Sequence, residues 1–229
     1  MTDHQSGGGA VLICDVVGSR RHTDRTALQQ RLSETMDRVN RSDRVVQPLH
    51  PILGDELQGA TRSLADALRL SLRLRLDLLP DVEMRIGLGL GPYTVFDPAS
   101  RPVSQDGPAW WAARKAIEEA AREGGSPAAR HVRCRLVAMS ADGEPPAAPV
   151  ARLSAAVNAY LGLQDFVLWS MSPRHHRLLA GLLEGEQQRA LASQEGISQS
   201  AVSQALQSSG AQAVAQSLDR LEVLESVSS

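Results

Sequence analysis

The sequence predicts an α/β domain, in which helices cover one face of a largely antiparallel sheet, followed by an all-helical domain. Two observations predict this class. Short apolar runs rich in β-branched residues alternate with amphipathic helical patterns as far as residue 140. Beyond a Pro-rich stretch at 141–149 only helical patterns recur, in a segment rich in Gln, Ser and Ala. We therefore expect a flexible lead at 1–9, an α/β domain at 10–140, a linker at 141–149 and a helical domain at 150–229.

The expected elements of the α/β domain each have a local signal. Residues 11–14 are a short apolar run typical of a buried strand. Gly54-Asp55 indicates a hairpin turn, and Pro48 and Pro51 place the first arm of that hairpin at a sheet edge or a bulge. In chain order, the pattern predicts helices at 24–41, 63–79 and 109–122, and further strands at 45–53, 56–60, 84–90, 93–96 and 132–139.

The helical domain contains the spacing of a helix-turn-helix. Helical patterns at 150–168 and 173–183 precede a segment, 188–206, with a small residue where two helices touch, Gly196 at the turn and apolar anchors on the second helix. A plain helical bundle gives the same spacing, so both readings stay open. If the motif is a helix-turn-helix, 198–207 is its recognition helix. The residues expected to contact DNA are then Arg189, Ser198, Gln199, Ser200, Ser203 and Gln204.

Charge and composition limit the classes of function. The net charge is −2, and 150–229 carries five arginines against seven acids, so a monomer should bind DNA weakly, whereas a homodimer would double its phosphate contacts. No apolar run approaches the roughly 20 residues that span a bilayer. Cys14 and Cys134 lie in apolar runs and are expected to be buried reduced thiols, which is typical of a cytoplasmic protein. Lys115 is the only lysine, which excludes a P-loop.

Two aspartates are candidate metal ligands. Asp15 ends the first strand and Asp55 lies at the hairpin tip, where two carboxylates can hold Mg²⁺ or Mn²⁺ that neutralises a nucleoside triphosphate. The backbone of Gly18 and Ser19 and the guanidinium of Arg20 are candidate phosphate contacts. Alternatively, the aspartates only cap turns. Glu56 can serve as a third ligand or equally form an ion pair or a cap.

Four segments in this order closely resemble the SatD family of bacterial proteins: DVVGSRR, GDELQG, RIGLGLG and DGPAWWAARKAIE. Their order is also similar to that of the nucleotidyl cyclase catalytic domain. This second resemblance implies a ferredoxin-like βαββαβ core and matches Asp15 and Asp55 to the two metal-binding aspartates of cyclases. Arg114 matches the arginine that stabilises transition-state charge. Trp110, however, stands where cyclases have an asparagine, and no lysine is present near Pro51 to select the purine.

These departures favour nucleotide binding without cyclisation. Asp106 and Gly107, just ahead of the last helix of the domain, are candidates for reading a base or ribose. Trp110 and Trp111 point about 100 degrees apart on a helix, so one is expected in the core and one half-exposed, unless one stacks on a base. We therefore expect a homodimeric, DNA-binding transcriptional regulator that senses a nucleotide with Mg²⁺ or Mn²⁺. The alternative is an active nucleotidyl cyclase or nucleotidyltransferase, with metals at Asp15 and Asp55 and Arg114 on the phosphate.

Overall fold

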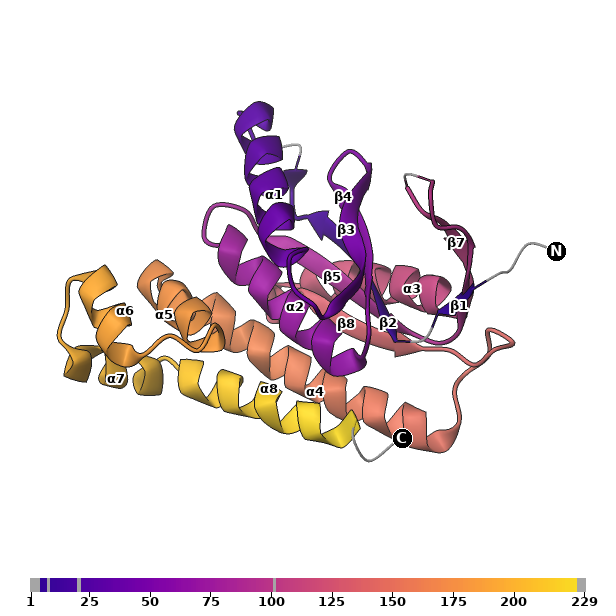
Figure 1. Cartoon of the computed structure of the whole chain (residues 1–229). Coiled ribbons are helices and arrows are strands. Elements are labelled where there is room, and N and C mark those ends of the chain that lie inside the picture. Colours follow the sequence, from indigo (N-terminus) through magenta and orange to yellow (C-terminus); the bar gives the residue numbers. More distant parts are fainter. Residues whose placement is uncertain (1–4, 8, 20–21, 101, 226–229) are drawn as a thin grey trace.

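The computed structural model describes residues 5–7, 9–19, 22–100 and 102–225, and has a mixed α/β architecture (Figure 1). Its main sheet has five strands in the order β3-β4-β2-β5-β8. The first four strands in this order pair antiparallel with one another. Strands β5 and β8 are parallel, and the chain between them passes through α3. In chain order the elements of this part are β2 (Ala10–Val16), α1 (Arg25–Val39), β3 (Val45–Leu53), β4 (Glu56–Thr61), α2 (Leu64–Leu78), β5 (Met84–Leu90), α3 (Pro108–Gly124), a 3₁₀ turn η2 (Pro127–Ala129) and β8 (Cys134–Ala138).

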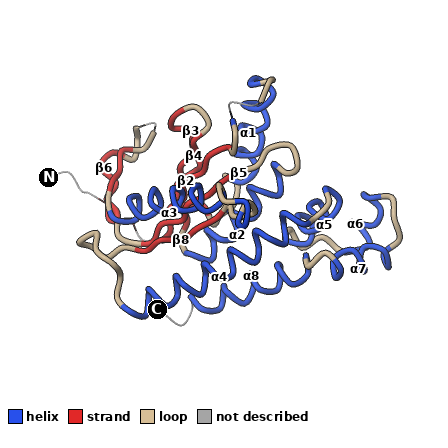
Figure 2. The backbone as a smooth tube through the Cα atoms, turned by 180° about the vertical axis from the view of Figure 1, so that it is seen from behind, coloured by secondary structure: helices blue, strands red, loops and turns tan. Residues whose placement is uncertain are grey.

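Helices cover both faces of the sheet, so the prediction of helices on one face was wrong. On β2, Leu12 and Cys14 belong to the core beneath α1 and α2, whereas Val11 and Ile13 pack with α3 on the opposite face (Figure 2). The reason lies in the strand itself, because a continuous apolar run has to be buried on both sides. A β-carbon on Gly89 would lie 2.0 Å from the carbonyl oxygen of Ala109, so glycine on β5 lets α3 approach the sheet closely.

Asparagine side chains close both edges of the main sheet. At the β3 edge, the side-chain nitrogen of Asn40 donates to the carbonyl of Leu49 (3.0 Å) and its oxygen accepts from the same residue's amide (2.7 Å). At the β8 edge, Asn158 makes the same pair of bonds to Leu136, at 2.8 and 2.9 Å. These contacts occupy backbone groups through which another strand could pair. As predicted, β3 is an edge strand with register shifts in its Pro-containing part.

A second, small sheet lies beside the main one and has the order β1-β6-β7. Its strands are β1 (Gln5–Gly7), β6 (Tyr93–Asp97) and β7 (Ser104–Asp106). Residues 5–7 pair with 93–95, so this part of the expected flexible lead is a strand instead. This strand was not predictable from the sequence, because three residues are too few to show a period. Residues 1–4 and 8 of the expected lead lie outside the described residues.

The C-terminal helices share a core with α2, and α5 and α8 pack directly against it. They are α4 (Ala148–Ser170), α5 (Pro173–Leu183), α6 (Gln188–Glu195), α7 (Gln199–Ser208) and α8 (Ala211–Glu225). One cluster of buried side chains runs from β2 through α2 to α8, and includes Leu12, Leu72 and Leu218. The division into two domains at 141–149 therefore stays a prediction about folding units. No described helix combines the length and the apolarity that crossing a membrane requires.

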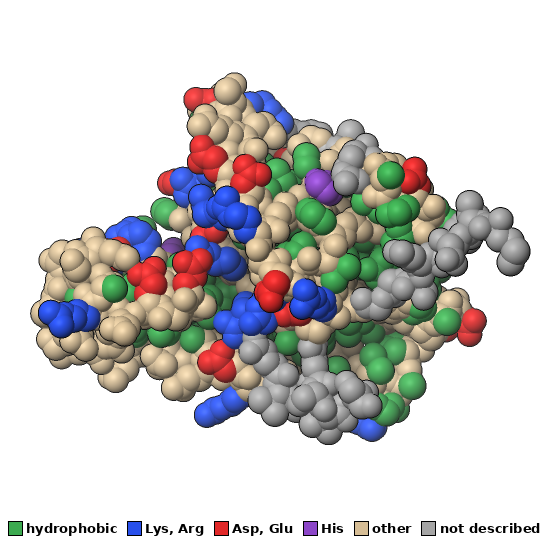
Figure 3. Space-filling model, viewed as in Figure 1, with side chains coloured by type: hydrophobic (Ala, Val, Ile, Leu, Met, Phe, Trp, Pro, Cys, Tyr) green, Lys and Arg blue, Asp and Glu red, His purple; other side chains and the backbone are tan. Residues whose placement is uncertain are grey.

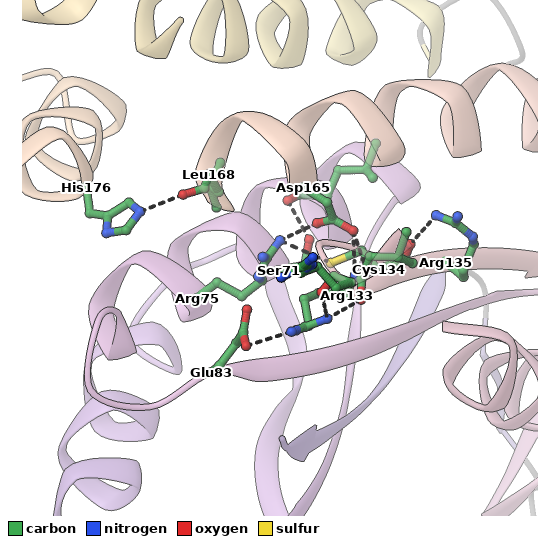
Figure 4. Close-up of polar contacts among 12 residues, drawn as sticks. Ser71, Arg75, Glu83, Arg133, Cys134, Arg135, Asp165, Leu168 and His176 are labelled. Carbon is green, nitrogen blue, oxygen red and sulfur yellow. Dashed lines mark hydrogen bonds and ion pairs between the residues drawn. The ribbon is translucent and has the colours of Figure 1, made fainter. Parts of the chain in front are cut away.

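A buried ion pair ties α4 to the sheet (Figure 4). Arg75 on α2 and Asp165 on α4 are 2% and 0% exposed, and their side chains form a salt bridge. The other carboxylate oxygen of Asp165 accepts from the backbone N–H groups of Arg133 (2.7 Å) and Cys134 (2.9 Å). Cys134 and Cys14 are both free and buried, which confirms the prediction of buried thiols.

Candidate functional site

Asp15 lies at the end of β2 on the face that α3 covers, because side chains alternate along a strand and Val11 and Ile13 face that way. It is opposite Arg85 of β5, whose Nη1 donates to Asp15 Oδ2 at 3.1 Å. The other oxygen, Oδ1, is buried and has no hydrogen-bond partner among the described residues. Asp15 therefore has one satisfied oxygen and one that still needs a partner.

Asp55 and Glu56 add negative charge next to Asp15. Asp55 follows Gly54, whose φ of 64° forms the predicted turn of the β3–β4 hairpin. Burial raises the pKa of the Asp15 carboxyl, Arg85 lowers it, and the charges of Asp55 and Glu56 raise it further, so the pKa is raised on balance. The fold thus places the two predicted metal ligands, Asp15 and Asp55, where the charge of one affects the other. The positive charge of Arg85 does not fully offset the effect of burial and of the neighbouring carboxylates on the pKa of Asp15.

Arg114 extends from α3 toward the carboxylates of Asp15 and Glu56, but its guanidinium is already paired with Glu56. Its Nη1 and Nη2 donate to the two carboxylate oxygens of Glu56 at 2.8 and 2.6 Å, and Gln58 donates to Glu56 at 3.1 Å. The hydrogen bond from Arg114 lowers the pKa of Glu56. Glu56 thus has the ion-pair role that the sequence left open. For Arg114 to bind a phosphate, this pair has to open.

A cavity of about 500 Å³ lies next to Arg114. Its lining residues are Ile13, Ile52, Gln58, Pro102, Val103, Gln105, Trp110, Trp111, Arg114, Lys115 and Glu118. Trp110 is 7% exposed and packs edge-on against Tyr93, whereas Trp111 is 49% exposed, which confirms the expected pair of one core and one half-exposed tryptophan. The Nε1 of Trp110 and the Oε1 of Gln105 are buried without a partner among the described residues. The cavity wall therefore holds one unused donor and one unused acceptor.

Asp106 and Gly107 order the start of α3. Asp106 Oδ1 accepts from the N–H of Gly107 and from Trp111 Nε1, both at 2.7 Å. Gly107 has a φ of 139°, and a β-carbon there would lie 2.8 Å from the Cα of Tyr93. In this arrangement Asp106 holds the Trp111 ring at the cavity, and the base-reading role predicted for the pair stays untested.

The predicted phosphate loop is described only in part. Gly18 has a φ of 69° in the turn after β2, and the carbonyl of Ser19 accepts from the N–H of His22 at 3.2 Å. Arg20 lies outside the described residues. Within the part of the chain that the structure describes, no group of three or more His, Cys, Asp or Glu side chains is arranged to hold a metal ion.

The sequence did not reveal the partners within this site. Arg85 is in the quoted RIGLGLG segment, yet its pairing with Asp15 depends on the register between β2 and β5. The contact of Glu56 with Arg114 joins residues 58 apart in the chain. Gln105 lies in a short strand without a recognisable pattern, and no sequence signal identified it as a cavity residue.

The α6–α7 segment has the local features expected at 188–206. Gly196 ends α6 with a φ of 64°, and the Ser198 hydroxyl accepts from the N–H of Ala201 at 3.2 Å to begin α7. Val202 and Leu206 are buried. Of the predicted DNA-contact residues, Arg189, Ser198, Gln199, Ser200 and Gln204 are exposed and Ser203 is partly exposed.

The charge around this segment is largely neutralised. Arg177 Nε lies 2.6 Å from Glu195 Oε1, and Arg174 Nε lies 3.5 Å from Glu195 Oε2. On the face drawn in Figure 3, basic and acidic side chains are interspersed over the molecule rather than gathered over α6 and α7. Arg174 and Arg177 both lie on α5, and α6 itself has one basic side chain, Arg189.

Comparison with known proteins identifies one family. The sequence model of the SatD family matches residues 10–217. No curated protein is similar enough to be matched. Among solved structures, the chain is similar to the crystal structure of the catalytic core of a rhodopsin-guanylyl cyclase with converted specificity in complex with ATPαS, with 20% sequence identity and a TM-score of 0.41. That similarity covers 52% of this chain and 76% of the cyclase chain.

Proposed function

This chain belongs to the SatD family, whose sequence model spans both the sheet and the helices that follow it, and from this premise we propose a single function for the two parts. The α/β part binds a nucleoside triphosphate with Mg²⁺ or Mn²⁺ at Asp15 and Asp55. Binding there controls the attachment of α6 and α7 to DNA, and the protein works as a homodimer. The observation that carries the proposal is the buried, unpartnered Oδ1 of Asp15 beside the charges of Asp55 and Glu56.

The donor set fits a metal that arrives with a nucleotide. A buried oxygen without a partner costs free energy, and neighbouring carboxylates repel each other, so a divalent cation relieves both costs. Mg²⁺ usually takes one or two protein carboxylates and completes its shell with water and phosphate oxygens. Two aspartates are therefore enough when a triphosphate is bound. When present, the metal supplies charge neutralisation for the phosphates, and Asp15 and Asp55 position it.

The neighbouring cavity suits the rest of the nucleotide. Its volume of about 500 Å³ lies within the range of about 300–1,000 Å³ typical of small-molecule sites. Trp111 offers a half-exposed ring for stacking, and Gln105 and Trp110 offer an acceptor and a donor. The strand order β3-β4-β2-β5, with α1 and α2 between strands, further supports the ferredoxin-like βαββαβ arrangement that the cyclase resemblance implies.

Two residues favour a sensor over a cyclase. Trp110, which stands where cyclases have an asparagine, is a core side chain packed on Tyr93. Arg114, the match to the catalytic arginine, is held by both oxygens of Glu56. In the alternative function, a nucleotidyl cyclase or nucleotidyltransferase, phosphate binding displaces Glu56 so that Arg114 stabilises the charge that develops on the phosphate.

The metal-nucleotide site is tested by thermal denaturation with ATP, GTP, CTP or UTP and Mg²⁺ or Mn²⁺, followed by analysis of each mixture for products. At 100 times its dissociation constant, a ligand that binds only the folded state adds about 2.7 kcal/mol of stability, or roughly 5–10 °C for a chain of this size. We expect a metal-dependent shift that Asp15→Asn abolishes and Asp37→Asn, an exposed control on α1, retains. Intact triphosphate supports the sensor, and cyclic or linear product supports the enzyme. If every nucleotide leaves the melting temperature unchanged, both are wrong.

DNA binding by α6 and α7 rests on their spacing, their buried anchors and the polar face of α7. It is tested by selection from a pool of random-sequence duplexes, with and without the nucleotide that gives the thermal shift. The wild-type protein should bind an enriched sequence, and the variants Gln199→Ala and Gln204→Ala should bind it more weakly. Because Glu195 neutralises Arg174 and Arg177, Glu195→Gln should strengthen binding to all duplexes and steepen its salt dependence. Failure to enrich any sequence would leave α6 and α7 as a helical bundle without a DNA role.

A further inference from the structure

One helix, α4, is apolar on both sides. Its inner side lies against β8 and α8, and Val157, Leu161 and Leu168 on it belong to the main buried core. Its opposite side is exposed to solvent. We call this side the outer face of α4, and it consists of Arg152, Ala155, Ala156, Ala159, Leu163, Phe166 and Trp169.

The outer face is a single continuous stripe. Its residues recur at spacings of three or four, with Ala155 and Ala156 adjacent, and the 18 residues from 152 to 169 extend about 25 Å along the helix. Leu163, Phe166 and Trp169 are 69%, 50% and 53% exposed. Phe166 packs edge-on against His131, with ring centres 5.4 Å apart, and lies 6.1 Å from Trp169, so the aromatic end is ordered by neighbouring side chains.

Charge is nearly absent from this stripe. Arg152 is the only charged residue on it, and the other charged residue of α4, Asp165, is buried toward the sheet. A helix on a protein surface normally shows charged or polar residues to water, and a helix that is apolar all round is normally buried. The outer face therefore has the character of a surface that another molecule covers.

We propose that the outer face of α4 pairs with the same face of a second copy of this chain, with the two helices antiparallel across a two-fold axis near residue 160. This orientation follows from the distribution of side-chain size. The N-terminal half of the face is small, with three alanines, and the C-terminal half is large, with Leu163, Phe166 and Trp169. Antiparallel pairing puts each small half against a large half, whereas parallel pairing puts large against large. It also places Arg152 of one copy beside Trp169 of the other, a cation–π pair.

The available area agrees with a second copy as the occupant. Aromatic side chains bury about 150–250 Å² each, so the exposed halves of Phe166 and Trp169 offer roughly 100 Å² apiece. Leu163, which is 69% exposed, and the exposed alanines extend this area toward the roughly 500 Å² per copy, or about 1,000 Å² in total, that a specific dimer interface needs. A membrane surface or DNA would instead select a basic rim, and this face has a single arginine.

This arrangement deepens the homodimer part of the proposed function and does not depend on nucleotide or DNA binding. Because α6 and α7 lie beyond the C-terminal end of α4 (Figures 1 and 2), the pairing places the two α6–α7 segments at opposite ends of the dimer. An isologous contact of this kind closes on itself and makes a dimer rather than a filament.

The test is sedimentation velocity of the full chain over a range of concentrations, without nucleotide or DNA. Wild type should be a dimer, and Ala155→Glu or Phe166→Lys should each weaken dimerisation at least about tenfold, since each places an unpaired charge in an apolar contact. Val46→Glu, which changes an exposed side chain on β3, should leave dimerisation unchanged. Residues 155 and 166 face each other across the proposed axis, so an equal mixture of the two charged variants should recover a dimer.

Three results would overturn the proposal: a monomeric wild type, a dimer that tolerates both charged variants, or a mixture that stays monomeric. The first would leave the outer face to a different protein. Phe166 also contacts His131, so circular dichroism should confirm that Phe166→Lys is folded. If it is not, Ala159→Arg, at an exposed position near the axis, provides the same test of the surface.

Discussion

Replacing Asp165 by asparagine tests how firmly α4 is joined to the sheet. The substitution keeps the size of the side chain but removes the negative charge opposite Arg75, which is 2% exposed. Breaking a buried ion pair from one side costs about 3–5 kcal/mol, because the remaining charge is left uncompensated. One amide oxygen can still accept from the N–H groups of Arg133 and Cys134, so we expect the loss to come from the charge.

The assay is urea unfolding at neutral pH, followed by far-UV circular dichroism and tryptophan fluorescence. A loss of about 3–5 kcal/mol is a large part of the 5–15 kcal/mol that stabilises most domains, and corresponds to roughly 6–20 °C in melting temperature for a chain of this length. The control is the double variant Arg75→Met with Asp165→Asn, which removes both charges and keeps a side-chain oxygen that accepts from the N–H groups of Arg133 and Cys134. It should therefore cost less than the single change.

The same experiment tests the expected division at 141–149. Since one cluster of buried residues connects β2, α2 and α8, we expect the two probes to report one shared transition. Two separate transitions would instead support independent folding of 150–229. A loss below about 1 kcal/mol for Asp165→Asn would refute the reasoning, because it would mean that water reaches Arg75.

Three further predictions concern packing, pH and the sheet edge. Gly89→Ala should cost at least about 1–3 kcal/mol in thermal unfolding, because its β-carbon meets the Ala109 carbonyl, whereas Gly162→Ala on α4, with open space around it, should gain about 0.5–1 kcal/mol. Burial lowers the pKa of His176. The stability that the neutral ring contributes is therefore complete above the ordinary pKa of histidine and is lost as the pH falls through the lowered pKa of His176. His176→Gln should flatten the plot of unfolding free energy against pH between about pH 7.5 and 5. Asn158→Ala should cost about 2 kcal/mol and speed hydrogen exchange at the Leu136 amide.

Each of these has a result that would count against it. Equal stability of Gly89→Ala and wild type would show that α3 can move away from β5 without loss. If His176→Gln leaves the pH dependence of stability unchanged, other groups cause the acid sensitivity. We expect a change because protonation of His176 places a hydrogen on its Nδ1, which is buried and has no partner among the described residues. Unchanged exchange at Leu136 would mean that another group protects this edge.

Local chemistry explains which parts of the structure were predictable. The helices and strands that were predicted, the Gly54 turn and the Gly196 helix end follow from patterns within a few residues, and all of them are present. The resemblance to the SatD family also rested on short segments, and the family match confirms it. These features depend on propensities, caps and turns, which neighbouring residues determine.

Pairings between distant residues were decided by the tertiary structure. The register of β2 against β5 brings Arg85 to Asp15, and the packing of α3 brings Arg114 to Glu56. In the same way, α4 was expected to follow a linker, yet Asn158 and Asp165 bond to the edge of β8. By itself, then, the sequence determined most of the elements, the α/β class and the family, because each depends on residues close together in the chain. Which charges meet, and which face of α4 stays open, depends on strand register and helix packing, and these are set only when the whole core assembles.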